Sequence, residues 1–277
     1  QGELTLGRLQ FNFQVIKEIK SLLGFELFLI VIPGLFDRPN VYSYDDDTER
    51  FLAFQIAFLK WLSETNQKPD VLHSHDHHTG LIPFMVQFCY DFASLKETPT
   101  VLTIHNGQYQ GWFGFDKLHY LPEFHQSKLG FLEWNGIANP LASAIKCAWK
   151  VTTVSPSYLD EISNNANGLE SLLRYERPKS IGILNGIDTE VWNPKTDEML
   201  VANFNVKNFK TGKYLFHFHT NWMNNFKEDD SFNQTIEIID KNIPYAFQTN
   251  EPNWKTAEIN LFPEGGIILN GIINLIG

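Results

Sequence analysis

The stretch Lys150-Val-Thr-Thr-Val-Ser-Pro-Ser157 decides the fold, because it joins a β-rich run directly to the start of a helix. β-Branched residues dominate the run from 150 to 154, which favours a buried strand. Ser155 is a favoured residue for a helix N-cap, and Pro156 suits the first position of a helix. The stretch therefore predicts a strand that leads into a helix across a short polar turn.

The same order of elements recurs along the middle of the chain. The expected strands are residues 25–32, 70–73, 100–104, 150–154 and 180–184, and expected helices include residues 48–64 and 80–92. The run from 25 to 32 is almost wholly apolar, which indicates a buried strand. Strands that alternate with helices predict an α/β fold, with a parallel sheet and helices on both of its faces.

Polar residues follow the carboxyl ends of four of these strands. They are His73, His75, Asp76, His105, Asn106, Ser155, Asn185 and Asp188. In open α/β sheets, ligands bind beyond the carboxyl ends of the strands. We therefore expect these side chains to line one crevice.

The densest polar run is His73-Ser-His-Asp-His-His78, and three interpretations of it are open. A metal-dependent hydrolase could use His73, His75 and Asp76, since histidine is a common metal ligand, although no second group of ligands follows. The histidines could instead pack in the core or cap a helix. In the third interpretation, imidazoles and a carboxylate hydrogen-bond a neutral polar ligand such as a sugar.

A second candidate region begins at His105-Asn106, directly after an apolar strand, and continues as Gln108-Tyr-Gln-Gly-Trp-Phe113. Asn-Gly at 106–107 is a strong turn dipeptide, and the same pattern recurs at Asn185-Gly186. Exposed aromatic rings beside amides, here Tyr109 and Gln110, suit carbohydrate binding. The same aromatic residues are equally typical of a hydrophobic core.

The composition narrows the class of protein. Of the 277 residues, 43% are hydrophobic and 19% are charged, as in globular proteins. The 22 basic and 32 acidic residues give a net charge of −10, which disfavours nucleic acid or an anionic membrane as partner. No apolar run reaches the roughly 18 residues of a membrane helix. The only cysteines, Cys89 and Cys147, lack metal-ligand spacing and suit a reducing, cytoplasmic compartment.

Several common motifs are absent from the sequence. There is no G-x-x-x-x-G-K-[ST] phosphate loop, no G-x-G-x-x-G dinucleotide fingerprint and no G-x-S-x-G nucleophile elbow. Dehydrogenase and serine hydrolase interpretations therefore lose support. The first methionine is Met85, so we expect the chain to lack its own start.

Seven segments stand in the order in which they occur in bacterial glycogen synthases and plant starch synthases. They are Phe36-Asp-Arg-Pro39 with Tyr42, residues 69–80, 103–106, 109–111, 151–158 and 168–174, and residues 183–188 with 192–194. The chain resembles this family of retaining glycosyltransferases, which use ADP-glucose. The resemblance implies the Rossmann-like N-terminal half of a GT-B fold. Residues 1–200 would form the acceptor-side domain, and residues 201–277 an unassigned segment or a remnant of the donor-side domain.

The resemblance also implies the reaction and the site. The family adds α-1,4-linked glucose from ADP-glucose to a glucan, with retention and without a cofactor or metal. By motif, His105 and Asp76 would be catalytic. The residues expected to bind substrate are Tyr42, His73, His75, Asn106, Tyr109, Gln110, Asn185 and Gly186.

Three departures from the family pattern stand out. His77 replaces a tryptophan that is often found at this position. The family's Lys-Thr-Gly-Gly loop and its donor-side motifs are not found, so we expect an incomplete chain. A non-catalytic glucan-binding module is therefore the alternative to an active glucosyltransferase.

Overall fold

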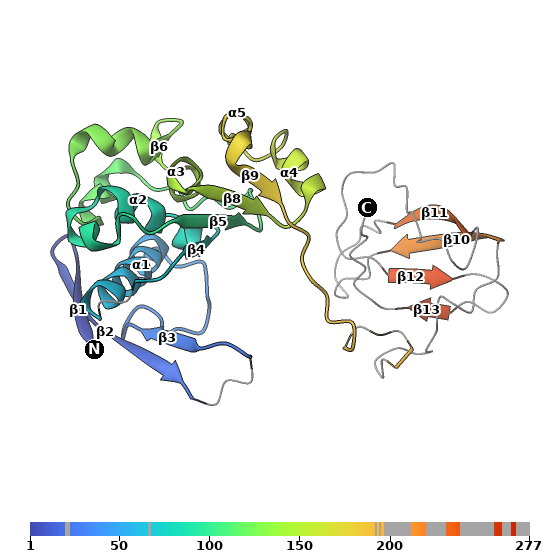
Figure 1. The fold of residues 1–277 in the computed structure, drawn as a ribbon, viewed down its shortest axis with the longest axis horizontal. Coiled ribbons are helices and arrows are strands. Elements are labelled where there is room, and N and C mark those ends of the chain that lie inside the picture. The colour runs from blue at the N-terminus through green and yellow to red at the C-terminus, as the bar shows by residue number, and fades with distance from the viewer. Residues whose placement is uncertain are drawn as a thin grey trace. The chain divides into compact units, whose positions relative to one another are not determined.

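The computed structural model describes residues 1–19, 23–65, 68–191, 193, 195 and 196, together with the backbone of four later strands. The chain forms two compact units, Gln1–Leu184 and Asn185–Gly277, and each is described by itself (Figure 1). The sequence-based division at residue 200 stays a prediction.

A four-stranded parallel sheet organises the first unit. Its strands, in spatial order, are β4 (Leu72–His75), β5 (Thr100–Ile104), β8 (Lys150–Thr153) and β9 (Ser180–Gly182). Every neighbouring pair is parallel, as the alternation of strands and helices predicts. The sheet therefore presents its carboxyl ends along one edge, where the polar residues follow.

The predicted strand-to-helix junction after β8 is confirmed. Helix α4 (Pro156–Ile162) begins with Ser155 as N-cap, and the Ser155 side chain accepts a hydrogen bond from the Tyr158 amide at 2.9 Å. This bond satisfies one of the free N–H groups of the first helical turn.

One face of the parallel sheet packs in a hydrophobic core. Leu102, Ile104 and Val151 are fully buried there against α3 (Pro140–Cys147), α4 and α5 (Glu170–Tyr175). Successive side chains of a strand point to opposite faces of the sheet. In β4, buried Leu72 and Ser74 therefore alternate with His73 and His75, which point to the second face. In the part of the chain that the structure describes, His73 and His75 on that second face are exposed.

The predicted helix at 48–64 is α1 (Asp47–Glu64), whose buried face packs against β1 (Gly2–Leu6). The helix expected at 80–92 is shorter, because α2 (Ile82–Phe88) ends where Cys89 adopts an extended backbone. A short bridge between Cys89 and Phe124 accounts for the break, and a 3-10 turn, η2 (Tyr90–Leu95), follows. Another, η1 (His77–Thr79), precedes α2.

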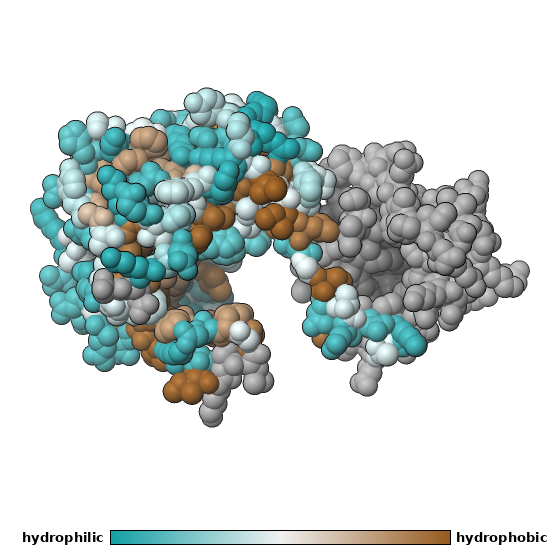
Figure 2. Space-filling view, in the orientation of Figure 1, coloured by the Kyte–Doolittle hydropathy of each residue, from teal (hydrophilic) through white to brown (hydrophobic). Residues whose placement is uncertain are grey.

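A strand is present at residues 25–32 as predicted, but it does not belong to the parallel sheet and it is not buried. The strand found there, β3 (Leu27–Val31), pairs antiparallel with β2 (Leu9–Glu18) in a separate sheet, β1-β2-β3. Leu29 and Val31 are 44% and 38% exposed. Figure 2 shows hydrophobic surface residues near the place of β2 and β3 in Figure 1. A continuous apolar run shows strand propensity but does not reveal which strand it pairs with.

The remaining elements lie between β5 and β9 and in the second unit. They are η3 (Phe115–Tyr120), η4 (Gln126–Phe131), β6 (Glu133–Trp134), β7 (Ile137–Ala138) and η5 (Arg177–Lys179). The second unit contains β10 (Gly212–His219), β11 (Ser231–Ile238), β12 (Glu258–Leu261) and β13 (Ile267–Leu269). These four strands pair antiparallel in the order β11-β10-β12-β13. Among the described residues, no helix has the length and apolarity needed to cross a bilayer.

Candidate functional site

The two residues predicted to be catalytic meet at the carboxyl ends of β4 and β5. The Asp76 side-chain Oδ1 accepts hydrogen bonds from the backbone amides of His105, at 2.8 Å, and Asn106, at 3.3 Å. The Asp76 amide in turn donates to the Thr103 carbonyl at 3.0 Å. Asp76 has a φ of 52° and a ψ of −164°, a strained conformation for a residue with a side chain. The strain is maintained by bonds that tie the two strand ends together.

Imidazole rings gather beside this junction. His75 Nδ1 lies 2.9 Å from His105 Nε2, and the two rings are 29° from parallel. His73 Nε2 lies 2.7 Å from the Thr103 hydroxyl. Burial first, and then the neighbouring imidazoles, lower the pKa of His75. Burial and His105 lower the pKa of His73 in the same way, so both rings are neutral at pH 7.

A cavity of about 630 Å³ opens next to the junction. Its lining residues are Tyr42, Asp47, Thr48, Phe51, Leu52, Gln55, Asp76, His77, His78, Leu81, Asn106, Tyr109, Gly111, Trp112, Phe113 and Pro140. The volume lies within the range of small-molecule sites, which combine apolar walls with a few polar groups. Four residues predicted from the sequence meet here, namely Tyr42, Asp76, Asn106 and Tyr109.

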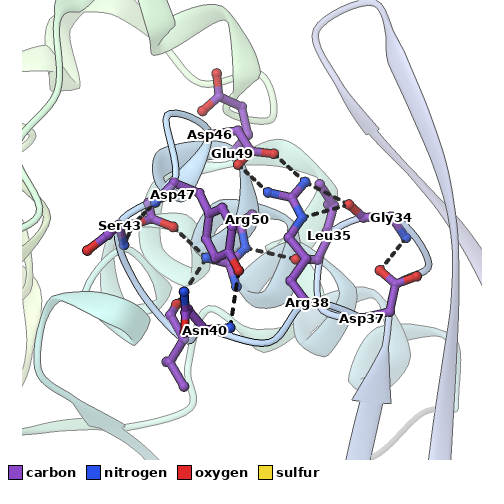
Figure 3. Close-up of polar contacts among 12 residues, drawn as sticks. Gly34, Leu35, Asp37, Arg38, Asn40, Ser43, Asp46, Asp47, Glu49 and Arg50 are labelled. Carbon is purple, nitrogen blue, oxygen red and sulfur yellow. Dashed lines mark hydrogen bonds and ion pairs between the residues drawn. The ribbon is translucent and has the colours of Figure 1, made fainter.

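The loop that carries Tyr42 is held by two arginines (Figure 3). Arg38 donates to both carboxylate oxygens of Asp46, at 2.6 and 2.7 Å, and to the Gly34 carbonyl at 2.7 Å. The hydrogen bond from Arg38 lowers the pKa of the Asp46 carboxyl group, which favours the ion pair. This accounts for the arginine of the Phe36–Pro39 motif.

Arg50 holds the same loop from inside the fold. Its side chain is 2% exposed and donates to the carbonyls of Leu35, at 2.8 Å, and Val41, at 3.0 Å (Figure 3). It also pairs with Asp47 at the start of α1. The backbone next to Tyr42 is therefore fixed, while the Tyr42 ring itself is 54% exposed and lies at the cavity.

His77 and His78 form one wall of the cavity. Their ring centroids are 3.8 Å apart, and burial, followed by the charge of His78, lowers the pKa of His77 to about 4. The His77 ring packs under Gly111, where an added Cβ would lie 2.4 Å from it. Glycine is required there by this close approach and by its φ of +67°. The histidine in place of tryptophan thus acts as a packing residue beneath the loop.

Gln110 has a different place from the other predicted substrate contacts. It is 3% exposed, and its Nε2 donates to the carbonyls of Ala166 and Asn167, both at 3.0 Å. Its Oε1 accepts from Asn139 Nδ2 at 2.7 Å. The side chain therefore joins three segments of the fold, and its contact with a substrate stays a prediction.

The other predicted residues divide between the cavity and the second unit. Asn106 Oδ1 accepts from the Gln108 amide at 3.0 Å, which is the predicted Asn-Gly turn. Tyr109 is 67% exposed at the cavity. Asn185 and Gly186 belong to the second unit, so their roles stay predictions.

Sequence reasoning missed part of the lining. Thr48, Phe51 and Gln55 of α1 line the cavity but were not among the predicted site residues. Trp112, half exposed, could have been found from the aromatic loop in which it lies.

The metal interpretation of the histidine run finds no geometric basis in the part of the chain that the structure describes. No group of three or more histidine, cysteine, aspartate or glutamate side chains there is arranged to hold a metal ion. The Asp76 Oδ1 is directed at two backbone amides. Cys89 and Cys147 are buried free thiols, and burial raises the pKa of each to about 12.

Comparison with known proteins agrees with this geometry. Residues 3–175 match the family model described as the starch synthase catalytic domain. A glycogen synthase of Flavobacterium johnsoniae is 60% identical over 212 residues, which cover 76% of this chain and 45% of the relative. A glycogen synthase of Streptococcus gordonii is 41% identical, covering 65% of this chain and 39% of the relative.

A solved structure is also similar. The catalytic domain of starch synthase IV from Arabidopsis thaliana, bound to ADP and acarbose, matches with a TM-score of 0.62 and 30% identity. The match covers 74% of this chain and 43% of that structure.

The chain belongs to the starch synthase catalytic domain family. The predicted fold class is confirmed: an α/β, Rossmann-like sheet that corresponds to the N-terminal half of a GT-B glycosyltransferase. The chain spans less than half the length of these two glycogen synthases.

Proposed function

We propose that this chain is the acceptor-side half of a glycogen or starch synthase-type glucosyltransferase. The reaction adds α-1,4-linked glucose from ADP-glucose to the end of a glucan, with retention. The observation that carries the proposal is the cavity in which Tyr42, Asn106 and Tyr109 meet beside the His105 strand end. The glycogen synthase relatives, and the starch synthase bound to ADP and acarbose, support the same reaction and substrates.

The cavity suits a neutral sugar. Tyr42, Tyr109 and Trp112 are each at least half exposed and offer flat apolar faces on which a pyranose ring stacks. The Asn106 amide supplies both donors and an acceptor for hydroxyl groups. A neutral ligand also suits an acidic chain, since it meets no long-range repulsion.

The strand-end junction suits the chemistry. Positive charge develops on the glucose ring as the nucleotide leaves, and dipoles fixed in advance stabilise such charge without reorganisation. In this proposal the exposed His105 ring contacts the transferring glucose. Asp76 lies at the cavity wall and fixes the backbone of His105 and Asn106.

The test is transfer of labelled glucose from ADP-glucose to maltoheptaose by this 277-residue chain, together with maltoheptaose affinity measured by calorimetry. Tyr109→Ala, at the cavity, should weaken glucan binding by about tenfold, which corresponds to about 1.4 kcal/mol. Tyr90→Ala is the matched control, since Tyr90 is 55% exposed on η2 and does not line the cavity.

Each result has a distinct meaning. Incorporation of label, lost in His105→Ala, supports the glucosyltransferase. Binding of maltoheptaose without transfer is the result expected of an acceptor-side half on its own, and also of the alternative, a non-catalytic glucan-binding module. Absence of both transfer and binding would refute the proposed function.

A further inference from the structure

The backbones on either side of the His75–His105 contact are fixed independently. The Thr79 hydroxyl accepts from the His75 amide at 2.6 Å and donates to the His75 carbonyl at 2.9 Å. The Asp76 carboxylate holds the His105 amide at 2.8 Å. The two imidazoles therefore meet because the two strand ends that carry them are locked.

The contact itself restricts where protons lie. A hydrogen bond between His75 Nδ1 and His105 Nε2, 2.9 Å apart, requires that one nitrogen carries the proton and the other does not. In two neutral rings the tautomers are then coupled, because the direction of the bond sets the second nitrogen of both rings together. Two fully protonated rings would bring two N–H groups face to face and break the bond.

A neighbouring chain of hydroxyl groups sets the state of His73. Thr152 Oγ1 donates to the Leu102 carbonyl, so it accepts from the Thr103 hydroxyl 2.6 Å away. Thr103 then accepts from His73 Nε2, which must carry the proton of that ring. The His73 ring lies 4.3 Å from the His75 ring, centroid to centroid, and opposes any positive charge there.

We propose that His75 is a positioning residue for His105, holding its ring through one shared proton between His75 Nδ1 and His105 Nε2. Among the described residues, His105 Nδ1 has no protein partner and is open to a ligand. The bond ties the protonation of this nitrogen to that of His75 Nδ1, because in two neutral rings both carry a proton or both lack one. That the ligand is the transferring glucose rests on the proposed function. His75 thus acts through His105, rather than as the direct substrate contact predicted from the sequence.

Besides His105 itself, two charged neighbours act on His75. His73, on the same strand, disfavours a proton on His75, whereas Asp76 in the following turn favours it. The hydrogen bond keeps its geometry with one added proton and is lost with two.

The test uses the full chain labelled with ¹⁵N-histidine and nuclear magnetic resonance of the ring nitrogens. In the wild type, His105 should give well-separated Nδ1 and Nε2 shifts, the sign of a single tautomer. His75→Ala should shift both signals toward the average of two tautomers. His75→Asn should restore the separation, because an asparagine amide places a donor and an acceptor where Nδ1 lies. His125→Asn, at the start of η4, is the matched control and should leave His105 unchanged.

Three results would overturn the proposal. The first is an unchanged His105 tautomer in His75→Ala. The second is a failure of His75→Asn to restore the tautomer. The third needs no variant and applies even if His75→Ala does not fold: wild-type His105 ring-nitrogen shifts that already lie at the average of two tautomers.

Glucan binding separates this proposal from the proposed function. His75→Ala should weaken maltoheptaose binding about tenfold and His75→Asn less than about threefold, if His105 holds the sugar. Equal weakening by both variants would identify His75 as a direct contact and overturn the positioning role. Wild-type protein that does not bind maltoheptaose would refute the proposed function, while the resonance experiment would still decide the state of the pair.

Discussion

Replacing Gln110 by leucine tests whether this residue serves the fold or the substrate. The substitution puts an apolar side chain of similar size in place of the amide. It removes three hydrogen bonds of 3.0 Å or less, to Asn139, Ala166 and Asn167, and a longer one of 3.5 Å to the Gly107 carbonyl. At about 1 kcal/mol for each neutral hydrogen bond, the free energy of unfolding should fall by about 3 kcal/mol. The Asn139 amide would also lose its acceptor, and Asn139 is the N-cap of α3.

The assay is equilibrium unfolding in urea, followed by tryptophan fluorescence. Trp134 is a local reporter, because its indole N–H donates to the Gly168 carbonyl at 2.9 Å, next to the segment that Gln110 holds. Gln108→Leu is the matched control. Gln108 is exposed and makes one 3.3 Å bond to the Asn165 carbonyl, so its loss should change stability by less than about 0.5 kcal/mol.

One pair of results would refute this reasoning. A Gln110→Leu protein that loses less than about 1 kcal/mol of stability but binds maltoheptaose more weakly would show a substrate contact. The direct role that the sequence predicts for Gln110 would then be correct, and the structural role derived from its three bonds would be wrong.

Three further predictions concern residues around the cavity. Asp76→Ala should weaken maltoheptaose binding at least about tenfold, because the His105 and Asn106 amides lose their shared acceptor. Asp76→Asn should keep part of the affinity, because its amide oxygen still accepts. Equal affinities of the two variants in calorimetry would contradict this. Arg50→Ala should lower the free energy of unfolding in urea by about 3 kcal/mol, since it removes the donor to the Leu35 and Val41 carbonyls and the ion pair with Asp47. Arg50→Lys should not restore the stability, because lysine lacks the forked guanidinium, and full rescue by lysine would contradict this. Burial lowers the pKa of His77 from 6.5 to about 4. Between these two pH values the unfolded chain binds a proton at His77 that the folded chain does not bind. The free energy of unfolding should therefore fall as the pH drops from 6.5 to about 4. His77→Phe should reduce that fall between pH 7 and 5, and an identical pH dependence in the variant would rule His77 out as its source.

The elements that sequence reasoning predicted best are those governed by local rules. The strand at 100–104 was placed at its observed bounds, and Ser155 was correctly assigned as a helix cap. Both follow from residue types within a few positions, namely an apolar β-branched run and a hydroxyl before proline. The order of such elements also sufficed for the parallel sheet.

The features that local patterns did not reveal depend on partners distant in the sequence. Residues 25–32 were assigned a strand correctly but the wrong sheet, since their partner β2 lies in a run whose pairing no local pattern reveals. Gln110 was grouped with Tyr109 because both lie in one loop. In the fold one side chain points into the cavity and the other into the protein.

The sequence by itself determined the family, the strand ends and the chemical groups available there. Only the tertiary structure decided how these groups face one another. His75 and His105 are 30 residues apart, and the parallel register of β4 and β5 brings them within 2.9 Å. The strained backbone of Asp76 then turns a carboxylate toward two amides of the neighbouring strand end. A residue's type sets which hydrogen bonds it is able to make, but strand pairing and the closing turn select the partners that it meets.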